Sequence, residues 1–166
     1  QCMAVISDMN QPLGNKVGNS LEIEESLDVL KGRGPADLTE LVLTLGSYMV
    51  VMGGKAANPA EGRQLLEQTI ADGTALDRFR AMVVAQGGDP RVIDDYTVMP
   101  QAQYKIPYRA KRAGVLSRLA ADEVGMASML LGGGRQQADD QLDYSVGIEL
   151  HHNLGDRVEA GEPLLT

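Results

Sequence analysis

The segment of residues 4–30 constrains the fold of this chain more than any other feature. Residues 4–6 are the continuous apolar run Ala-Val-Ile, which is typical of a short buried parallel strand. A loop rich in glycine and asparagine follows at residues 11–20, and Asn19 with Glu22 three residues later predicts the start of a helix. A strand, a loop and a helix in this order predict an α/β unit, and in open α/β sheets such loops form the binding sites.

Helix signals continue through the first half of the chain. Further helix starts are predicted at Asp37, at Asn58–Pro59 and at Thr74. Glycine pairs at residues 53–54 and 87–88 end two of these helices, because glycine readily adopts the backbone conformation that closes a helix. This half of the chain is therefore predicted to contain one strand and four helices.

The pattern changes after Asp89–Pro90, where turn residues separate short β-like runs. These runs cover residues 103–108, 114–119, 126–131, 144–150 and 156–165. We therefore predict an α/β plus α+β fold. Residues 1–98 would be part of a mixed α/β domain with one buried strand and four helices, and residues 99–166 a C-terminal β-rich lobe that is truncated at its end.

Composition excludes several classes of protein. The net charge of −8 argues against a nucleic-acid partner, because phosphate contacts need clustered lysine and arginine. Cys2 is the only cysteine, so no internal disulfide can form. A lone cysteine fits a reduced, cytoplasmic compartment. No apolar run reaches the roughly 18 uncharged residues of a membrane span, so we expect no membrane partner. Both ends look cut, and we expect an internal piece of a longer protein.

The loop at residues 11–20 is a candidate cation site. Gly14, Gly18 and Asn19 allow turns that point backbone carbonyls inward, and Glu25 lies one to two helical turns beyond. Carbonyl oxygens with one carboxylate form a site for a hard cation, and a single negative charge suits a monovalent ion. An ordinary connection with a solvated Glu25 explains the same residues, and both interpretations stay open at this point.

Two further patterns deserve comparison with simpler explanations. Gly132, Gly133 and Gly134 predict a mobile loop in which Arg135 is a candidate for an anion or closure contact; the alternative is a flexible turn with a solvated arginine. The run GDRVEAGEPL at residues 155–164 is similar to the turn of biotinyl and lipoyl carrier domains. It lacks the exposed lysine of a carrier, so a compact β lobe explains it better.

Several motifs together resemble one family. SDMNQPLGNKVGNSLEIEE, LKGRGPADLTELVLTLGSYMV, AQGGD, MLLGGGR and DYSVGIELHHNLGDRVEAGEPL occur in the order found in pyrimidine-nucleoside phosphorylases and thymidine phosphorylases. The resemblance covers essentially the whole chain. It implies a pentosyltransferase of nucleoside salvage, which converts a pyrimidine nucleoside and phosphate to the free base and a pentose 1-phosphate.

The resemblance also implies specific roles for residues. A potassium ion would be held by the backbone carbonyls of Leu13 and Lys16 and by the carboxylate of Glu25, and no organic cofactor is implied. The family often has a small residue where Lys16 stands, and a nearby ammonium could compete with the ion. The loop Gly132-Gly133-Gly134-Arg135 would become ordered when two domains close over substrate.

Other parts of the family pattern are missing from this sequence. The Lys-x-Ser-x-Gly-Gly phosphate loop is absent, as are the arginine, serine and lysine that grip the pyrimidine. The resemblance therefore implies no catalytic and no substrate-binding residue here, and we expect these 166 residues alone to be inactive. The resemblance implies that the parent enzyme binds phosphate and a pyrimidine nucleoside and forms a homodimer through a helical domain that is missing here. The preference between uridine and thymidine stays open.

Two alternatives to a pyrimidine-nucleoside phosphorylase stay open. One is a nucleotide phosphorylase or a phosphoribosyltransferase of the same superfamily. Another is a non-catalytic module built around a biotinyl- or lipoyl-like lobe.

Overall fold

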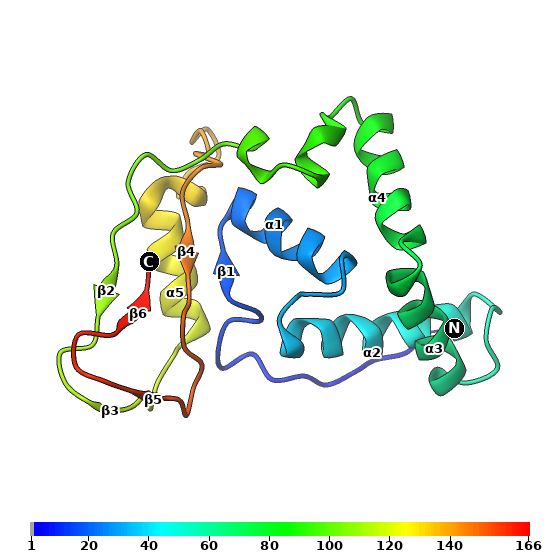
Figure 1. Cartoon of the computed structure of the whole chain (residues 1–166), viewed down its shortest axis with the longest axis horizontal. Helices are drawn as coiled ribbons and strands as arrows, with labels where there is room; N and C mark the ends of the chain where they lie inside the picture. The colour runs from blue at the N-terminus through cyan, green and yellow to red at the C-terminus, as the bar shows by residue number, and fades with distance from the viewer. Residues whose placement is uncertain (1) are drawn as a thin grey trace. The chain divides into compact units, whose positions relative to one another are not determined.

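The computed structural model describes residues 2–166, which divide into two compact units (Figure 1). The first unit contains the residues up to Ser7 and Glu25–Tyr96, and the second contains Asp8–Glu24 and Thr97–Thr166. Helix α1 (Asn19–Leu30) begins in the second unit and continues into the first. The predicted family domains, residues 1–98 and 99–166, stay a prediction.

The first unit is helical, as predicted. After α1 come α2 (Ala36–Met52), α3 (Pro59–Ala71), α4 (Thr74–Ala85) and the short 3₁₀ helix η1 (Pro90–Ile93). A second 3₁₀ helix, η2 (Tyr96–Val98), begins at the last residue of this unit and continues into the second unit. The start of α3 shows the local cause most clearly. The side chain of Asn58 accepts a hydrogen bond from the backbone N–H of Glu61, and the proline in the first helical position needs no backbone partner.

Helices α2 and α3 pack against each other at close range. A Cβ atom placed on Gly62 would lie 2.7 Å from the backbone carbonyl oxygen of Ser47, so the two helix backbones nearly touch. Beside this contact, Arg63 of α3 donates two hydrogen bonds, of 2.7 and 2.8 Å, to the carboxylate of Glu40 on α2. The same guanidinium also pairs with Glu67 at 2.8 Å. A bidentate arginine contact fixes one helix against the other.

The ion pair across α2 and α3 predicts a specific titration. Hydrogen bonding from Arg63 lowers the pKa of Glu40 below its ordinary value of 4.5. Because the folded-state pKa is depressed, the stabilisation from Glu40 is complete above 4.5 and is lost as the pH falls through the lowered pKa. An NMR titration of the Glu40 side-chain carboxyl should therefore give a midpoint below 4.5.

The control variants for this titration come from the same arginine. Arg63→Gln should return the Glu40 midpoint to its ordinary range. Glu67→Gln should leave it low, because it removes only the second carboxylate. An ordinary Glu40 midpoint in the unsubstituted protein would show that the bidentate contact does not persist in solution.

The second unit is a lobe of short antiparallel strand pairs that also contains the start of α1 and one further α-helix. Its strands are β1 (Lys16–Val17), β2 (Tyr108–Arg109), β3 (Gly114–Val115), β4 (Ile148–Glu149), β5 (Arg157–Val158) and β6 (Pro163–Leu165). They pair as β1 with β4, β2 with β6, and β3 with β5. Helix α5 (Ala121–Ser128) continues into the π-helical turn η3 (Met129–Gly133). Val124, Ile148 and Leu150 form the core of this lobe.

The mixed content of helices and short strands confirms the predicted fold class, with two corrections. Residues 4–6 form no strand, and the side chain of Ile6 is 100% exposed. A strand needs a neighbour for its N–H and C=O groups, and within residues 2–166 no segment pairs with this run. Residues 126–131 are helical rather than extended, because alanine, methionine and leucine favour a helix. In the same helix, the buried residues Val124 and Ser128 are four positions apart, which is a helical spacing.

The other predicted β runs of the lobe contain strands, but these are only two or three residues long. Within residues 2–166, no helix is long and apolar enough to cross a lipid bilayer.

Candidate functional site

The second half of the loop at residues 11–20, from Asn15 to Ser20, is attached to the segment of residues 144–150. In the β1–β4 pair, Lys16 lies opposite Glu149 and Val17 opposite Ile148. Outside this pair, the N–H of Leu150 donates to the carbonyl of Asn15 at 2.7 Å, and the N–H of Ser20 donates to the carbonyl of Tyr144 at 3.2 Å. The loop predicted from its glycines is therefore held in place by backbone contacts with a distant part of the sequence.

Two glycines allow these backbones to approach each other. A Cβ atom on Gly18 would lie 2.6 Å from the carbonyl oxygen of Val146, and Gly18 also has a φ of +143°. A Cβ atom on Gly147 would lie 2.5 Å from the carbonyl oxygen of Val17. Real Cβ atoms do not approach carbonyl oxygens this closely, so only glycine fits at either position.

The start of helix α1 differs in one detail from the predicted capping box. Glu22 does reach back to a backbone N–H, but the donor is Gly18, at 3.1 Å, rather than Asn19. The N–H of Glu22 in turn donates to the carbonyl of Gly18 at 2.8 Å. The side chain of Asn19 is used elsewhere, because its amide nitrogen donates to the carbonyl of Gly133 at 2.9 Å. The predicted reciprocal box between Asn19 and Glu22 is therefore not formed, because Gly18 has no side chain to accept a hydrogen bond and the amide of Asn19 is engaged elsewhere.

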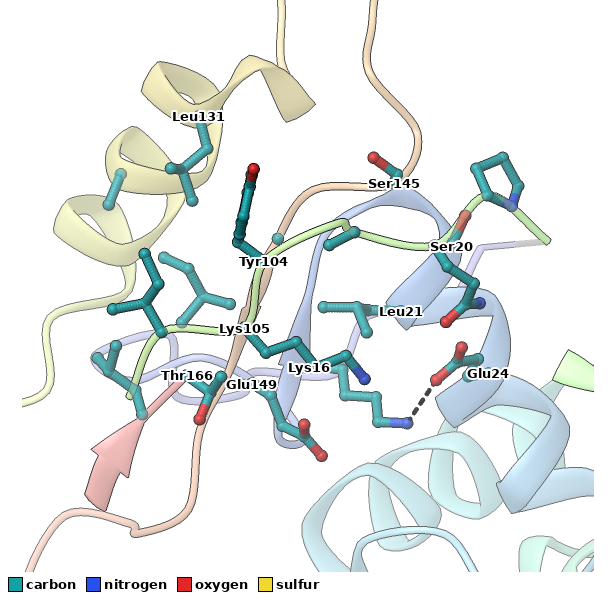
Figure 2. A pocket seen from close by; sticks show the side chains of 18 of the residues that line it. Lys16, Ser20, Leu21, Glu24, Tyr104, Lys105, Leu131, Ser145, Glu149 and Thr166 are labelled. Atoms are coloured by element: carbon teal, nitrogen blue, oxygen red, sulfur yellow. Dashed lines mark hydrogen bonds and ion pairs between the residues drawn. The ribbon is translucent and has the colours of Figure 1, made fainter. Parts of the chain in front are cut away.

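The side chain of Lys16 is paired within the second unit. Its ammonium lies 2.9 Å from the carboxylate of Glu24, and the two side chains are only 17% and 13% exposed (Figure 2). The carboxylate of Glu24 therefore balances the charge of the Lys16 ammonium, which was expected to compete with a bound cation. Glu25, the next residue of α1, is buried with 5% exposure.

The predicted cation ligands fall in both units. Leu13 and Lys16 belong to the second unit and would contribute backbone carbonyls, whereas Glu25 belongs to the first. Two neutral carbonyl oxygens and one carboxylate suit a monovalent cation. Among residues 2–166 there is no group of three or more His, Cys, Asp or Glu side chains that would hold a metal ion. The set of Leu13, Lys16 and Glu25 stays a prediction.

The glycines of residues 132–134 meet close packing rather than open space. Gly132 has a φ of +104°, which favours glycine, and its carbonyl accepts a hydrogen bond from the N–H of Asp143 at 2.9 Å. A Cβ atom on Gly133 would lie 3.1 Å from both Ser128 oxygens, and one on Gly134 would lie 3.0 Å from Cγ of Met129. Arg135 is exposed just beyond this turn.

Asp143, which holds one side of this turn, is itself fixed by Ser145. Its carboxylate accepts hydrogen bonds from the hydroxyl and the N–H of Ser145, at 2.6 and 2.9 Å. The hydroxyl contact, followed by the backbone contact, lowers the pKa of Asp143 below its ordinary value. Both contacts favour the ionised form of Asp143.

A pocket of about 630 Å³ in the second unit was not anticipated from the sequence (Figure 2). Its apolar walls include Leu21, Leu130 and Ile148, and its charged groups include Lys105 and the Lys16–Glu24 pair. These residues come from separate segments that only the fold brings together, so no local sequence pattern could have revealed the pocket.

The turn that is similar to carrier domains is explained by its own hydrogen bonds. The N–H of Glu159 donates to the carboxylate of Glu162 at 2.7 Å, and Gly161 has a φ of +84°. Lys111 is the last lysine in the sequence, so residues 112–166, which include this turn, have no lysine to carry biotin or lipoate.

Comparisons with known proteins agree on one group of enzymes. A family model described as "Glycosyl transferase family, a/b domain" matches residues 1–76, and one described as "Pyrimidine nucleoside phosphorylase C-terminal domain" matches residues 115–166. The first range contains the loop at residues 11–20, and the second contains the turn at residues 132–135.

Curated relatives share more than half of the aligned residues. The chain is 54% identical over 164 residues to the pyrimidine-nucleoside phosphorylases of Staphylococcus aureus strains USA300, NCTC 8325 / PS 47 and bovine RF122 / ET3-1. In each case the alignment covers 99% of this chain and 38% of the relative. The chain therefore spans well under half the length of the curated relatives that it matches.

Proposed function

Because this chain belongs to the pyrimidine-nucleoside phosphorylase family, we propose that it contributes to an enzyme that cleaves pyrimidine nucleosides reversibly with phosphate. Uridine, deoxyuridine and thymidine are the proposed substrates. A phosphate oxygen forms a bond to the anomeric carbon of the sugar while the bond from that carbon to the base breaks. The products are the free base, which keeps the electron pair and takes up a proton, and a pentose 1-phosphate.

The observation that carries this proposal is the agreement of two independent matches within one chain. One match, to residues 1–76, covers the loop at residues 11–20 and the first unit as far as the start of α4, and the other, to residues 115–166, covers much of the second unit. A phosphoribosyltransferase or a carrier module would explain only one of these parts. A cytoplasmic homodimer is a further proposal, which rests on the resemblance to the family alone.

We assign the chain a supporting role in this reaction. Leu13, Lys16 and Glu25 are the proposed ligands of a potassium ion, which would hold the loop carbonyls together by electrostatic attraction. The pairing of Lys16 with Glu24 supports this assignment, because it neutralises the ammonium next to the proposed ligand carbonyl. Bond cleavage itself needs groups that hold phosphate against the sugar and stabilise the leaving base. The sequence has no Lys-x-Ser-x-Gly-Gly run for that task.

A chimera tests the proposed function directly. The aligned stretch of the Staphylococcus aureus USA300 enzyme would be replaced by residues from this chain, which are 54% identical to it. We expect the chimera to release base from uridine, deoxyuridine or thymidine only when phosphate is present, because the relative supplies the phosphate and base contacts. Release is measured by the ultraviolet absorbance change on loss of the sugar.

Two controls make this result interpretable. The 166-residue chain alone should release no base, and phosphate-dependent release by it would overturn the supporting role. Glu25→Gln in the chimera should raise the potassium concentration needed for half-maximal activity, because the amide removes the proposed carboxylate ligand. A chimera that folds to the size of the relative yet releases no base would contradict the proposed function.

A further inference from the structure

We propose that Asn19 is a positioning residue that couples the turn at residues 132–135 to the loop at residues 11–18. In this proposal, a bound cation restricts the movement of the loop. The side-chain amide of Asn19 then restricts the movement of the turn, because it is hydrogen-bonded to Gly133. The cation part of the inference rests on the proposed function, whereas the coupling contact rests on geometry alone.

The coupling contact is a single hydrogen bond between residues 114 positions apart. The amide nitrogen of Asn19 lies 2.9 Å from the carbonyl oxygen of Gly133, and both residues are half-buried. A backbone carbonyl only accepts hydrogen bonds, so the nitrogen of the amide rather than its oxygen must face Gly133. The chemistry of the acceptor therefore fixes the orientation of the side chain.

The backbone of Asn19 is held on both sides, so the amide is presented from a rigid position. On one side, Gly18 is in close backbone contact with Val146 and Gly147. On the other side, the N–H of Ser20 donates to the carbonyl of Tyr144 at 3.2 Å. Movement of the loop would therefore carry the amide of Asn19 with it.

Two backbone carbonyls of the turn at residues 132–135 accept hydrogen bonds from other segments of the lobe. Its carbonyl at Gly132 is held by the N–H of Asp143, at 2.9 Å, and its carbonyl at Gly133 is held by Asn19. The residues after Arg135 are held by a local contact. The carboxylate of Asp140 accepts hydrogen bonds from the backbone N–H groups of Gln136 and Gln137. Loss of the Asn19 contact would leave one of the two anchors.

The cation enters this argument through its position in the loop. Leu13 and Lys16 are proposed to offer their carbonyls, and the clamped Gly18 lies between them and Asn19. A bound ion would restrict the loop, and a restricted loop would hold the amide where the turn needs it. Coupling of this kind is reciprocal, so an ordered turn would also tighten cation binding.

Limited trypsin digestion of the full chain tests the coupling without any substrate. Trypsin cuts after the exposed Arg135, and cleavage after the exposed Arg112 of the same unit serves as an internal reference. Mass spectrometry gives the ratio of the two rates in potassium chloride and in tetramethylammonium chloride at equal ionic strength. Potassium should lower the ratio for the unsubstituted chain, because it orders the turn.

The variant Asn19→Ala should raise the cleavage ratio by about fivefold, the fold-change expected for loss of one neutral hydrogen bond. It should also abolish the potassium effect on that ratio. Asn153→Ala is the matched control, because Asn153 is an exposed asparagine of the same unit whose contact is made by its backbone N–H. This control should behave like the unsubstituted chain.

Three outcomes would overturn the proposal. They are an unchanged ratio in Asn19→Ala, a raised ratio that still responds to potassium, and an unsubstituted chain that shows no potassium effect. If Asn19→Ala unfolds as a whole, cleavage rises at both sites, and the variant Asn19→Gln, which keeps the amide donor, decides instead. A cleavage ratio that stays low in Asn19→Gln supports the proposal. A raised ratio in Asn19→Gln overturns it. An inactive chimera would contradict the proposed function but would leave this result unchanged.

Discussion

Gly147→Ala is expected to destabilise the second unit by roughly 3 kcal/mol, the upper part of the usual range for overpacking. The added methyl group would lie 2.5 Å from the carbonyl oxygen of Val17 and 2.7 Å from Cδ1 of Leu21. The leucine can rotate away, but the carbonyl belongs to the paired strand β1 and cannot move without breaking the β1–β4 pair. The free energy of unfolding is measured by urea denaturation.

The matched control for Gly147→Ala is Gly125→Ala in the same unit. No heavy atom lies within 4 Å of a Cβ on Gly125, which is an exposed position of α5. Alanine favours a helix over glycine by about 0.5–1 kcal/mol, so this variant should be slightly stabilised. Equal changes in the two variants would show that the loop at residues 11–20 does not pack on Gly147 as closely as the structure has it.

Gly62→Ala is expected to destabilise the first unit by about 2 kcal/mol, because overpacking outweighs the gain in helix propensity. The new methyl group would lie 2.7 Å from the carbonyl oxygen of Ser47 and 3.3 Å from two further backbone atoms of that residue. Relief requires α2 and α3 to move apart, which also weakens the contact of Arg63 with Glu40. The midpoint of thermal unfolding, followed by circular dichroism, measures the loss.

Gly46→Ala in α2 is the comparison that isolates the cause. Its Cβ would also meet an atom at 2.7 Å, but that atom is Cδ1 at the end of the flexible side chain of Leu66. Rotation of this side chain relieves the clash, and the gain in helix propensity remains. We therefore expect Gly46→Ala to change the midpoint much less than Gly62→Ala. A reversed order would mean that the side chain of Leu66 is less free to move than the backbone of Ser47.

The helices were predictable from the sequence because their signals are local. Asn58, Pro59 and the glycine pair at residues 53–54 act on their own neighbours, and the structure ends α2 and begins α3 at these residues. The family was also predictable, because several motifs occur together and in order. These two predictions are confirmed.

The strands were less predictable because their stability comes from distant partners. Residues 4–6 have the composition of a strand, but composition cannot supply the neighbour that a strand needs. Residues 126–131 were wrongly predicted as extended, because a short apolar run fits a strand and a buried helix equally well. Length and the preceding acidic residues Asp122 and Glu123, typical of a first helical turn, would have favoured the helix.

The candidate site shows the same division between local and distant information. The glycines of the loop and of the turn lie where backbones approach closely or φ is positive, which the sequence alone does not show. The proposed closure role of Gly132, Gly133, Gly134 and Arg135 stays a prediction. The pairs Lys16–Glu24 and Asn19–Gly133 depend on the fold, since neither residue type nor spacing identifies the partner. The cation ligands Leu13, Lys16 and Glu25 stay a prediction.

The attachment of the loop to residues 144–150 has a consequence for the order of events during protein synthesis. Residues 11–20 leave the ribosome long before the segment that holds them, since Asn19 and Gly133 alone are 114 positions apart. Contacts of such high sequence separation form late, whereas helices α2 to α4 need only neighbours that have already emerged. We therefore expect helices α2 to α4 to form in the nascent chain before the loop at residues 11–20 reaches its final conformation, and the proposed ion site would be completed only after residues 144–150 have been made.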